Sequence, residues 1–161
     1  METLTLISSD NHKIEIDSKS AQKSTILKKK MSEKNQENNN EMQLNTIKYD
    51  ILKRIVEYLN YYKNKTVKEV PKPTPSENLN TFLDDWDLQY INSMNLDETF
   101  ELMNAASDLG IQSLLDLASS KVAYILKNKG IEDIRNMFST GCDLSEKELK
   151  KYEELNLKLN I

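Results

Sequence analysis

The sequence predicts a mixed α/β domain in which a small sheet comes first and helices make up most of the remaining chain. Three observations lead to this prediction. Two short runs rich in β-branched residues, 3–7 and 13–16, stand on either side of turn-forming residues. A third short apolar run comes at 42–44. From Tyr49 onward, apolar residues recur every three or four positions, which is the spacing of amphipathic helices.

The first two runs predict a β-hairpin, because the residues between them, 8–12, are types that favour turns. Asp17 or Ser18 is then expected to cap a short helical turn. A second short helix comes next, with Ile26 and Met31 on its apolar side.

Two polar segments interrupt the predicted elements. Residues 28–41 read KKKMSEKNQENNNE, which is too polar to offset the entropy lost on ordering, so we expect a mobile loop there. An amphipathic helix is predicted over 49–62. Residues 63–80 then form an insertion that holds all three prolines of the chain, and alternate prolines favour extended backbone over helix. We expect residues 62–78 to be mobile as well.

After the insertion the sequence predicts helices to the end of the chain. Asp97 is expected to cap a helix whose apolar side includes Phe100 and Met103. Gly110 occupies the position of a left-handed residue that ends this helix. The next helix is predicted over 113–128, where leucine, isoleucine and valine recur at helical spacing.

Two further helices are predicted, over 131–138 and from Glu146 onward. Gly130 and Gly141 are the expected breaks on either side of the first. The apolar faces of the helices after the insertion are too broad for one small bundle to bury. This excess indicates a surface that binds a protein partner.

Composition and charge argue against several classes of function. The formal net charge of −4 argues against binding along a phosphate backbone, so no nucleic-acid partner is expected. No apolar run approaches the ~20 residues of a membrane span, and the N-terminus lacks the pattern of a signal peptide. Cys142 is the one cysteine, so no disulfide forms within the chain. We expect a soluble protein in a reducing, intracellular compartment.

No group of residues in the sequence is suited to covalent chemistry. His12 is the sole histidine and lies in a predicted turn, while Cys142 has no second cysteine with which to bind zinc. The three glycines are scattered, so there is no phosphate-binding loop. The three aspartates within 84–87, around Trp86, are interpreted as helix caps and solvated charges. We therefore expect no catalysis, no metal site and no cofactor.

Several motifs succeed one another in register over nearly the whole chain. A Ser-Ser-Asp turn (8–10) separates the two predicted strands, and ILKRIV (51–56) lies in the helix after the third. Trp-Asp (86–87) comes after the insertion, and FELMNAASDLGIQSLLD (100–116) and EDIRNMF (132–138) complete the set. Together they resemble the S-phase kinase-associated protein 1 family, the adaptors of cullin-based SCF ubiquitin ligases, and the chain is identified as a divergent member.

The resemblance implies an α/β fold of the BTB/POZ type: a small three-stranded sheet covered by helices, with a C-terminal helical extension. It implies a BTB/POZ-like domain at 1–126 and F-box-binding helices at 127–161. In the family, the terminal helices bind the F-box of a substrate receptor, and the BTB/POZ-like part docks on the N-terminal domain of a cullin. The residues that carry over to the F-box surface are Phe100, Met103, Leu115, Val122, Ile134 and Phe138. The residues that carry over to the cullin surface are Ile26, Met31, Ser107 and Asp108.

Three departures from the family pattern make this chain divergent. Ser107 and Asp108 stand where the family usually presents Asn and Tyr to the cullin. Residues 155–159 supply leucines where family members have a tryptophan that packs against the F-box. Residues 144–146 lack the proline that is hydroxylated in some members. We expect docking to a typical cullin to be weakened at Ser107 and Asp108.

Three functions fit this resemblance. The first is an adaptor subunit of an SCF-type ubiquitin ligase that bridges an F-box protein to a cullin. The second is a protein that binds F-box proteins without engaging a cullin and sequesters or stabilises them. The third is an adaptor similar to elongin C, although elongin C ends near Leu126. No membrane partner is expected. We expect a weak homodimer when no F-box protein is bound, and a cytoplasmic and nuclear location, in host-cell compartments if the gene is viral.

Overall fold

The structure is a computed structural model that describes residues 3–32, 40–72, 78–127 and 129–138, together with positions 148, 150, 151 and 154. The chain divides into two compact units. The first is Met1–Tyr124 and the second is Ile125–Ile161. The first holds the sheet and most of the helices, and the second holds the end of α6 (Gln112–Lys127) and α7 (Ile131–Met137).

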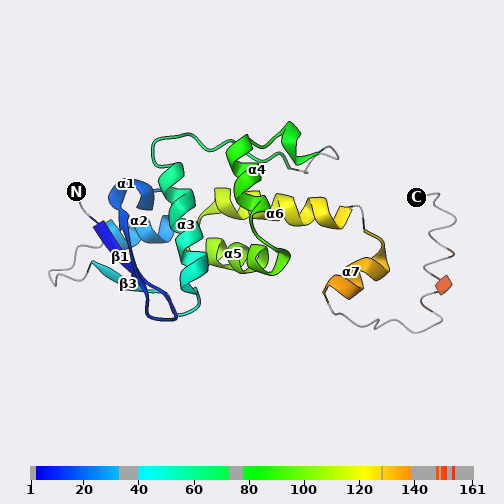
Figure 1. The fold of residues 1–161 in the computed structure, drawn as a ribbon, viewed down its shortest axis with the longest axis horizontal. Helices are drawn as coiled ribbons and strands as arrows, with labels where there is room; N and C mark the ends of the chain where they lie inside the picture. The colour runs from blue at the N-terminus through cyan, green and yellow to red at the C-terminus, as the bar shows by residue number, and fades with distance from the viewer. Residues whose placement is uncertain are drawn as a thin grey trace. The chain divides into compact units, whose positions relative to one another are not determined.

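The sheet has three strands in the order β2-β1-β3, which confirms the predicted α/β class (Figure 1). β1 (Thr3–Ile7) and β2 (Lys13–Asp17) pair antiparallel, as expected of the hairpin. β3 (Glu41–Gln43) pairs in parallel with the other edge of β1. Leu4 and Leu6 are buried while their neighbours in β1 are more exposed, so one face of the sheet carries the core.

The Ser-Ser-Asp motif stabilises the hairpin turn. Ser8 is buried, and its Oγ donates to the carbonyl oxygen of His12 at 3.1 Å and accepts from the N–H of His12 at 3.0 Å. The side chain of Asp10 accepts from the backbone N–H of Tyr49 at 3.0 Å, which ties the turn to the start of α3 (Tyr49–Tyr61). The pKa of Asp10 lies below its ordinary value because its carboxylate is hydrogen-bonded to the Ser8 side chain and to the backbone N–H groups of Asp10 itself and Tyr49. His12 is exposed, as predicted.

Helix α2 (Thr25–Ser32) is longer than the sequence predicts. The polar loop was expected over 28–41, but residues 28–32 are helical. Lysine and methionine are good helix formers, and the Oγ of Ser24 accepts from a backbone N–H in the first turn at 3.1 Å, so the helix continues into the polar segment. Residues 33–39 lie outside the described residues, and the mobility of this segment stays a prediction.

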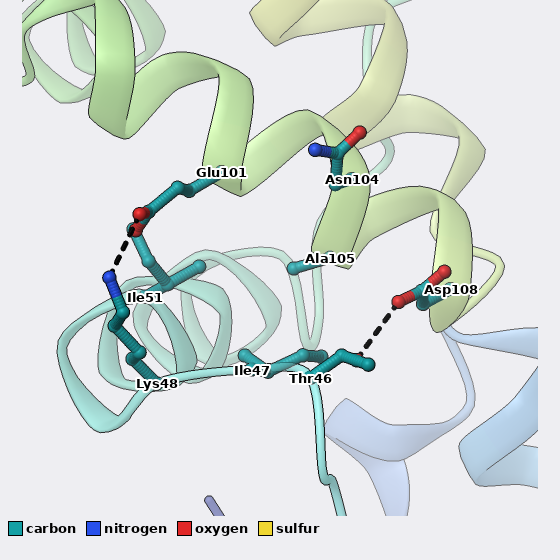
Figure 2. A pocket seen from close by; sticks show the side chains of 8 residues that line it. All are labelled: Thr46, Ile47, Lys48, Ile51, Glu101, Asn104, Ala105 and Asp108. Atoms are coloured by element: carbon teal, nitrogen blue, oxygen red, sulfur yellow. Dashed lines mark hydrogen bonds and ion pairs between the residues drawn. The ribbon is translucent and has the colours of Figure 1, made fainter. Parts of the chain in front are cut away.

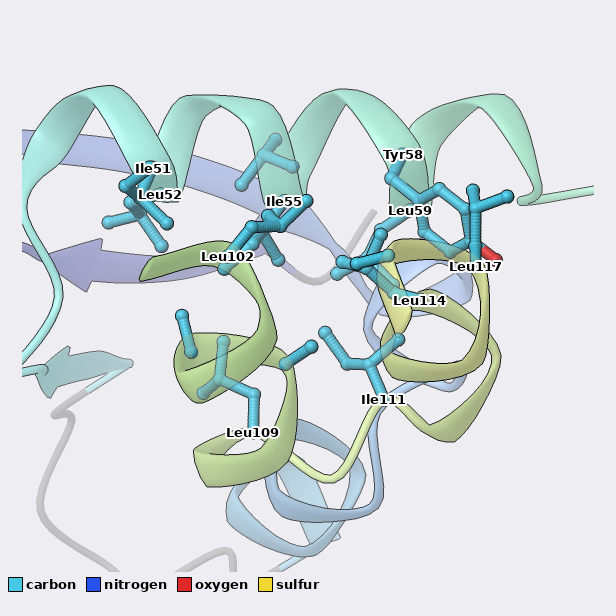
Figure 3. Packing of buried hydrophobic residues seen from close by; sticks show 14 of the residues in the cluster. Ile51, Leu52, Ile55, Tyr58, Leu59, Leu102, Leu109, Ile111, Leu114 and Leu117 are labelled. Carbon is cyan, nitrogen blue, oxygen red and sulfur yellow. The ribbon is translucent and has the colours of Figure 1, made fainter. Parts of the chain in front are cut away.

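The core of the first unit lies where α3 packs against α5 (Leu96–Asp108) and α6 (Figure 3). Ile55 and Leu59 project from α3, and Leu102 from α5 and Leu114 from α6 meet them; all four side chains are fully buried. The predicted apolar face of α3 is confirmed by this packing. The remaining helices of the first unit are α1 (Ser18–Ala21), the 3-10 helix η1 (Leu79–Thr81) and α4 (Asp85–Asn92).

The described part of the insertion is anchored to the first unit. Val67 and Val70, three residues apart, are half-buried and pack against the core, and Leu79 is buried at the other end of the insertion. The segment 62–78 therefore has apolar anchors that its composition did not reveal. Residues 73–77 lie outside the described residues, and mobility stays a prediction.

For α5, the predicted C-terminal residue is confirmed and the predicted N-cap is wrong. Gly110 has a φ of 62°, so it is the left-handed residue expected after the helix. The N-cap, however, is Asn95 and not Asp97. The side chain of Asn95 accepts from the N–H of Glu98 at 2.8 Å, and the carboxylate of Glu98 accepts from the N–H of Asn95 at 2.9 Å. This reciprocal capping box satisfies two helix-terminal donors, which a single cap at Asp97 would not. Gly130 precedes α7 with an ordinary φ of −70°.

Asp87 is buried, which corrects its interpretation as a solvated charge. The hydroxyl of Tyr62 donates to both carboxylate oxygens of Asp87, at 2.7 and 2.8 Å. Burial raises the pKa of Asp87, although the Tyr62 hydrogen bond opposes this rise. The neighbouring Trp86 ring stacks on Tyr61 with 3.7 Å between ring centroids and lies 5.0 Å from Tyr90. Trp86 is half-buried and packs against the core.

Candidate functional site

A hydrogen-bonded junction joins the start of α2 to the end of α5. The Oγ of Ser24 donates to the carbonyl oxygen of Leu109 at 2.5 Å, and the N–H of Thr25 donates to that of Gly110 at 3.3 Å. A Cβ on residue 110 would overlap the Oγ1 of Thr25, so glycine permits both the turn and the close approach. The junction places Ile26, the next residue of α2, beside the C-terminal end of α5.

Three of the four residues predicted to face a cullin lie at this junction. Ile26 is 38% exposed, which is unusual for a large apolar side chain in this unit. Ser107 and Asp108, in the last turn of α5, are exposed as well. We name these three residues the α2–α5 surface. Met31 is half-buried and packs against the core, so it offers a partner only part of its side chain.

A pocket of about 220 Å³ adjoins this surface, between α5 and the start of α3 (Figure 2). At one end, the Nζ of Lys48 pairs with a carboxylate oxygen of Glu101 at 3.0 Å. At the other end, the hydroxyl of Thr46 donates to the carboxylate of Asp108 at 3.1 Å. The sequence did not predict this pocket. The eight lining residues are Thr46, Ile47, Lys48, Ile51, Glu101, Asn104, Ala105 and Asp108.

Four of the six predicted F-box residues belong to the first unit. Phe100 and Met103 are three residues apart on α5, and Leu115 and Val122 are seven residues apart on α6, so each pair shares one helical face. Phe100, Met103 and Leu115 are half-buried. Met103 and Leu115 also pack against the core, so they divide their area between the fold and any partner.

Val122 is less available to a partner than the sequence suggested, because it is only 8% exposed. The adjacent Lys121 is buried too, and its Nζ donates to the carbonyl oxygens of Ile91, in the last turn of α4, and of Met94, two residues after this helix. Burial lowers the pKa of this ammonium group, while the negative charge of Glu98 opposes this lowering. This part of α6 thus belongs to the fold. A Val122→Asp variant is therefore expected to destabilise the first unit. A loss of F-box binding in this variant could then come from unfolding.

The other two F-box residues lie in the second unit, on and after α7. Ile134 is half-buried, and Phe138, the residue after the helix, is 38% exposed. Ile131 is 66% exposed, and it was not among the predicted site residues. Its position seven residues before Phe138 puts both on one side of the helix, a signal that was present in the sequence. We name Ile131, Ile134 and Phe138 the α7 surface. Arg135 pairs with Glu132 at 2.5 Å within this helix.

Among the described residues, no group of His, Cys, Asp and Glu side chains is placed to hold a metal ion. In the same residues, no helix combines the length and apolar character needed to cross a bilayer. The predicted last helix from Glu146 falls mostly outside the described residues; Glu148, Lys150, Lys151 and Glu154 have helical backbone and are exposed. What the described sites offer chemically is recognition by packing, hydrogen bonds and charge.

Comparison with protein families gives two matches along the chain. Residues 2–64 match the tetramerisation (POZ) domain of the Skp1 family, and residues 112–156 match the dimerisation domain of the same family. The first match covers the sheet and α3, and the second begins at α6 and continues past α7. The chain belongs to the Skp1 family.

Curated relatives agree over nearly the full length. The S-phase kinase-associated protein 1 homolog of Tetrahymena thermophila is 36% identical over 94% of this chain and 90% of its own. The E3 ubiquitin ligase complex SCF subunit sconC of Neosartorya fischeri is 31% identical over 92% of both chains. SKP1-like protein 18 of Arabidopsis thaliana is 29% identical over 94% of this chain and 92% of its own. The resemblance inferred from the motifs is confirmed.

Proposed function

We propose that this chain is the adaptor subunit of an SCF-type ubiquitin ligase and bridges an F-box substrate receptor to a cullin. The observation that carries the proposal is the Skp1-family match at both ends of the chain. The sconC relatives, which are named as SCF subunits, support the same role.

The described surfaces suit a bridging protein. A bridge needs two faces that can be occupied at the same time, and the α2–α5 surface and the α7 surface belong to different compact units. Each surface exposes a large apolar side chain, Ile26 in one and Ile131 in the other. Exposed apolar residues of this size gain free energy when a partner covers them.

In this role the chain works by protein–protein contact alone. It catalyses no step itself and needs no cofactor. The cytoplasm and nucleus are the proposed location, since SCF substrates and ubiquitin are handled there. Without an F-box protein, the exposed Ile131 and Phe138 would favour a weak homodimer, which sedimentation at rising concentration would detect.

The sequestering alternative is not favoured by the comparisons, since relatives that match nearly the whole chain are named as SCF subunits. Its one motivation is that Ser107 and Asp108 are both exposed where the family pattern has Asn and Tyr for the cullin. The elongin C-like alternative is not favoured, because the Skp1-family match runs to residue 156, well past Leu126.

A pull-down with two variants tests the proposal. Ile26→Asp and Ile131→Asp each place a charge in the first turn of a helix, where acidic residues are tolerated, so both helices should persist. We expect Ile26→Asp to lose the cullin N-terminal domain and retain an F-box protein, and Ile131→Asp to do the reverse. If the wild-type chain binds an F-box protein and no cullin, the sequestering alternative replaces the bridge.

A further inference from the structure

The pocket beside the α2–α5 surface is lined by one stripe of α5. Glu101, Asn104, Ala105 and Asp108 stand at positions i, i+3, i+4 and i+7, so they face the same side over two helical turns (Figure 2). The opposite wall comes from the loop before α3 and from the first turn of α3. The helix therefore holds the polar side chains of Glu101, Asn104 and Asp108 in a row along one wall of the pocket.

The two carboxylates of the pocket differ in their electrostatic surroundings. Glu101 is neutralised by Lys48 at 3.0 Å. Asp108 receives a hydrogen bond only from the neutral hydroxyl of Thr46, and within the described residues no cationic side chain pairs with it. Among the described residues, one negative charge of the pocket is therefore left without a cationic partner.

The position of Asp108 in its helix adds to this negative potential. Asp108 is the last residue of α5, and the last turn of α5 holds no basic residue. The C-terminal end of a helix carries a partial negative charge, so a carboxylate there costs the free protein stability. A charge that destabilises the isolated chain becomes favourable once a cation covers it.

The floor between the two carboxylates is apolar. Ile47, Ile51 and Ala105 line it, but they are only 3%, 5% and 4% exposed, so they offer an occupant little contact area. Lysine and arginine side chains end in a cationic head, which matches the carboxylate of Asp108. Asn104, one turn before Asp108, also lines the pocket.

We propose that this pocket receives a basic side chain of the cullin, whose cationic head pairs with the carboxylate of Asp108. The inference rests on the proposed function, since it assigns the partner chemistry of the α2–α5 surface. Asp108 is then a specificity-determining residue that selects a cullin bearing lysine or arginine at this place.

The test measures binding of the full-length chain to the N-terminal domain of the cullin encoded in the same genome. Asp108→Asn keeps the shape and an acceptor for Thr46 but removes the charge. We expect about tenfold weaker binding. The salt dependence of binding should also become shallower, because an ion pair is screened by salt. Asp97→Asn, the matched control, removes the same charge from an exposed position at the other end of α5, outside the pocket, and should change affinity less than about twofold.

A second readout separates this role from a structural one. Asp108→Asn should raise the melting temperature of the free protein, because it removes an unfavourable negative charge from the C-terminal end of α5. The same change should weaken binding to the cullin. If Asp108→Asn binds as tightly as wild type with the same salt dependence, the pocket inference is wrong and the adaptor function stands. If neither wild type nor variant binds the cullin while both bind an F-box protein, the bridging function itself fails.

Discussion

The α2–α5 surface and the α7 surface would gain their binding energy in different ways. The first sets one exposed isoleucine, Ile26, beside a pocket whose two carboxylates already accept hydrogen bonds, Glu101 from Lys48 and Asp108 from Thr46. The second presents Ile131 and Phe138 from one short helix. Burial of apolar area is worth roughly 25 cal/mol per Å², whereas exchanging one hydrogen bond for another gains little. The contrast implies that α7 would supply affinity and the α2–α5 surface would supply selectivity.

The largest effect is expected at α7. Replacing both Ile131 and Phe138 with Asp should weaken binding of an F-box protein at least ~100-fold, because burying each side chain is worth about 1.5–3 kcal/mol. Titration calorimetry with an F-box peptide measures the loss. Asn136→Asp adds one negative charge to an exposed position on the far side of the same helix and is the control. Equal losses in both variants would mean that charge, not the apolar face, decides binding.

The next effect concerns selectivity. Towards a typical cullin, from an organism whose adaptor carries Asn-Tyr, this chain should bind ~30-fold more weakly than its Ser107→Asn, Asp108→Tyr variant. This factor corresponds to a central tyrosine that contributes about 2 kcal/mol. Titration of both proteins against that cullin N-terminal domain checks it. Equal affinities would remove the selectivity assigned to this surface.

The third prediction concerns the stability of the first unit at the contact between α2 and the end of α5. Gly110→Ala should destabilise the first unit by about 1–2 kcal/mol, because alanine is strained at a φ of 62° and its Cβ meets Thr25. Gly130→Ala is the matched control. Its φ is −70° and the nearest atom to a new Cβ, on Asp133, is 3.8 Å away, so its cost should be smaller. Urea denaturation compares the two, and a neutral Gly110→Ala would contradict the tight junction.

The smallest effect concerns pH. Burial opposes ionisation of Asp17, but hydrogen bonds from Lys63 and from the N–H and hydroxyl of Ser20 outweigh it and lower its pKa to about 2. A carboxylate with a lowered pKa in the folded state stabilises above its unfolded pKa, and this stabilisation is lost as the pH falls towards 2.

Asp17→Asn keeps a good N-cap for α1 and removes the charge. We expect wild type to be more stable by about 1 kcal/mol at pH 7, after allowance for screening of a partly exposed ion pair. This gap should close between pH 4 and pH 2, the interval between the ordinary value of 3.8 and about 2. Thermal melts of both proteins across this range measure it. A gap that does not change with pH would show that Asp17 acts only as a cap.

Local patterns in the sequence predicted the elements well. The hairpin, α3 and the left-handed Gly110 each depend on residues close together in the chain, so periodicity and turn chemistry were sufficient. Cap choice was harder. Asn95 and Asp97 are both good N-cap residues, and the reciprocal bond with Glu98 decides between them.

Features that depend on distant residues were not predicted. Thr46 and Asp108 are 62 residues apart in the chain, and only the packing of α3 on α5 brings them together to form the pocket. The sequence around Asp87 does not distinguish it from a surface carboxylate, because the Tyr62 hydroxyl that donates to it lies 25 residues away in the chain. In the same way, Val122 resembles a free apolar residue of α6, although the fold buries it.

Simultaneous binding of both partners is the decisive test of the bridging role. Light scattering during size-exclusion chromatography gives the mass of complexes formed from this chain, an F-box protein and the cullin N-terminal domain. A bridging adaptor predicts one species whose mass equals one copy of each, formed in either order of addition. If the F-box protein and the cullin domain instead displace each other, or the cullin domain elutes alone, the two surfaces do not serve a bridge and the proposed function is contradicted.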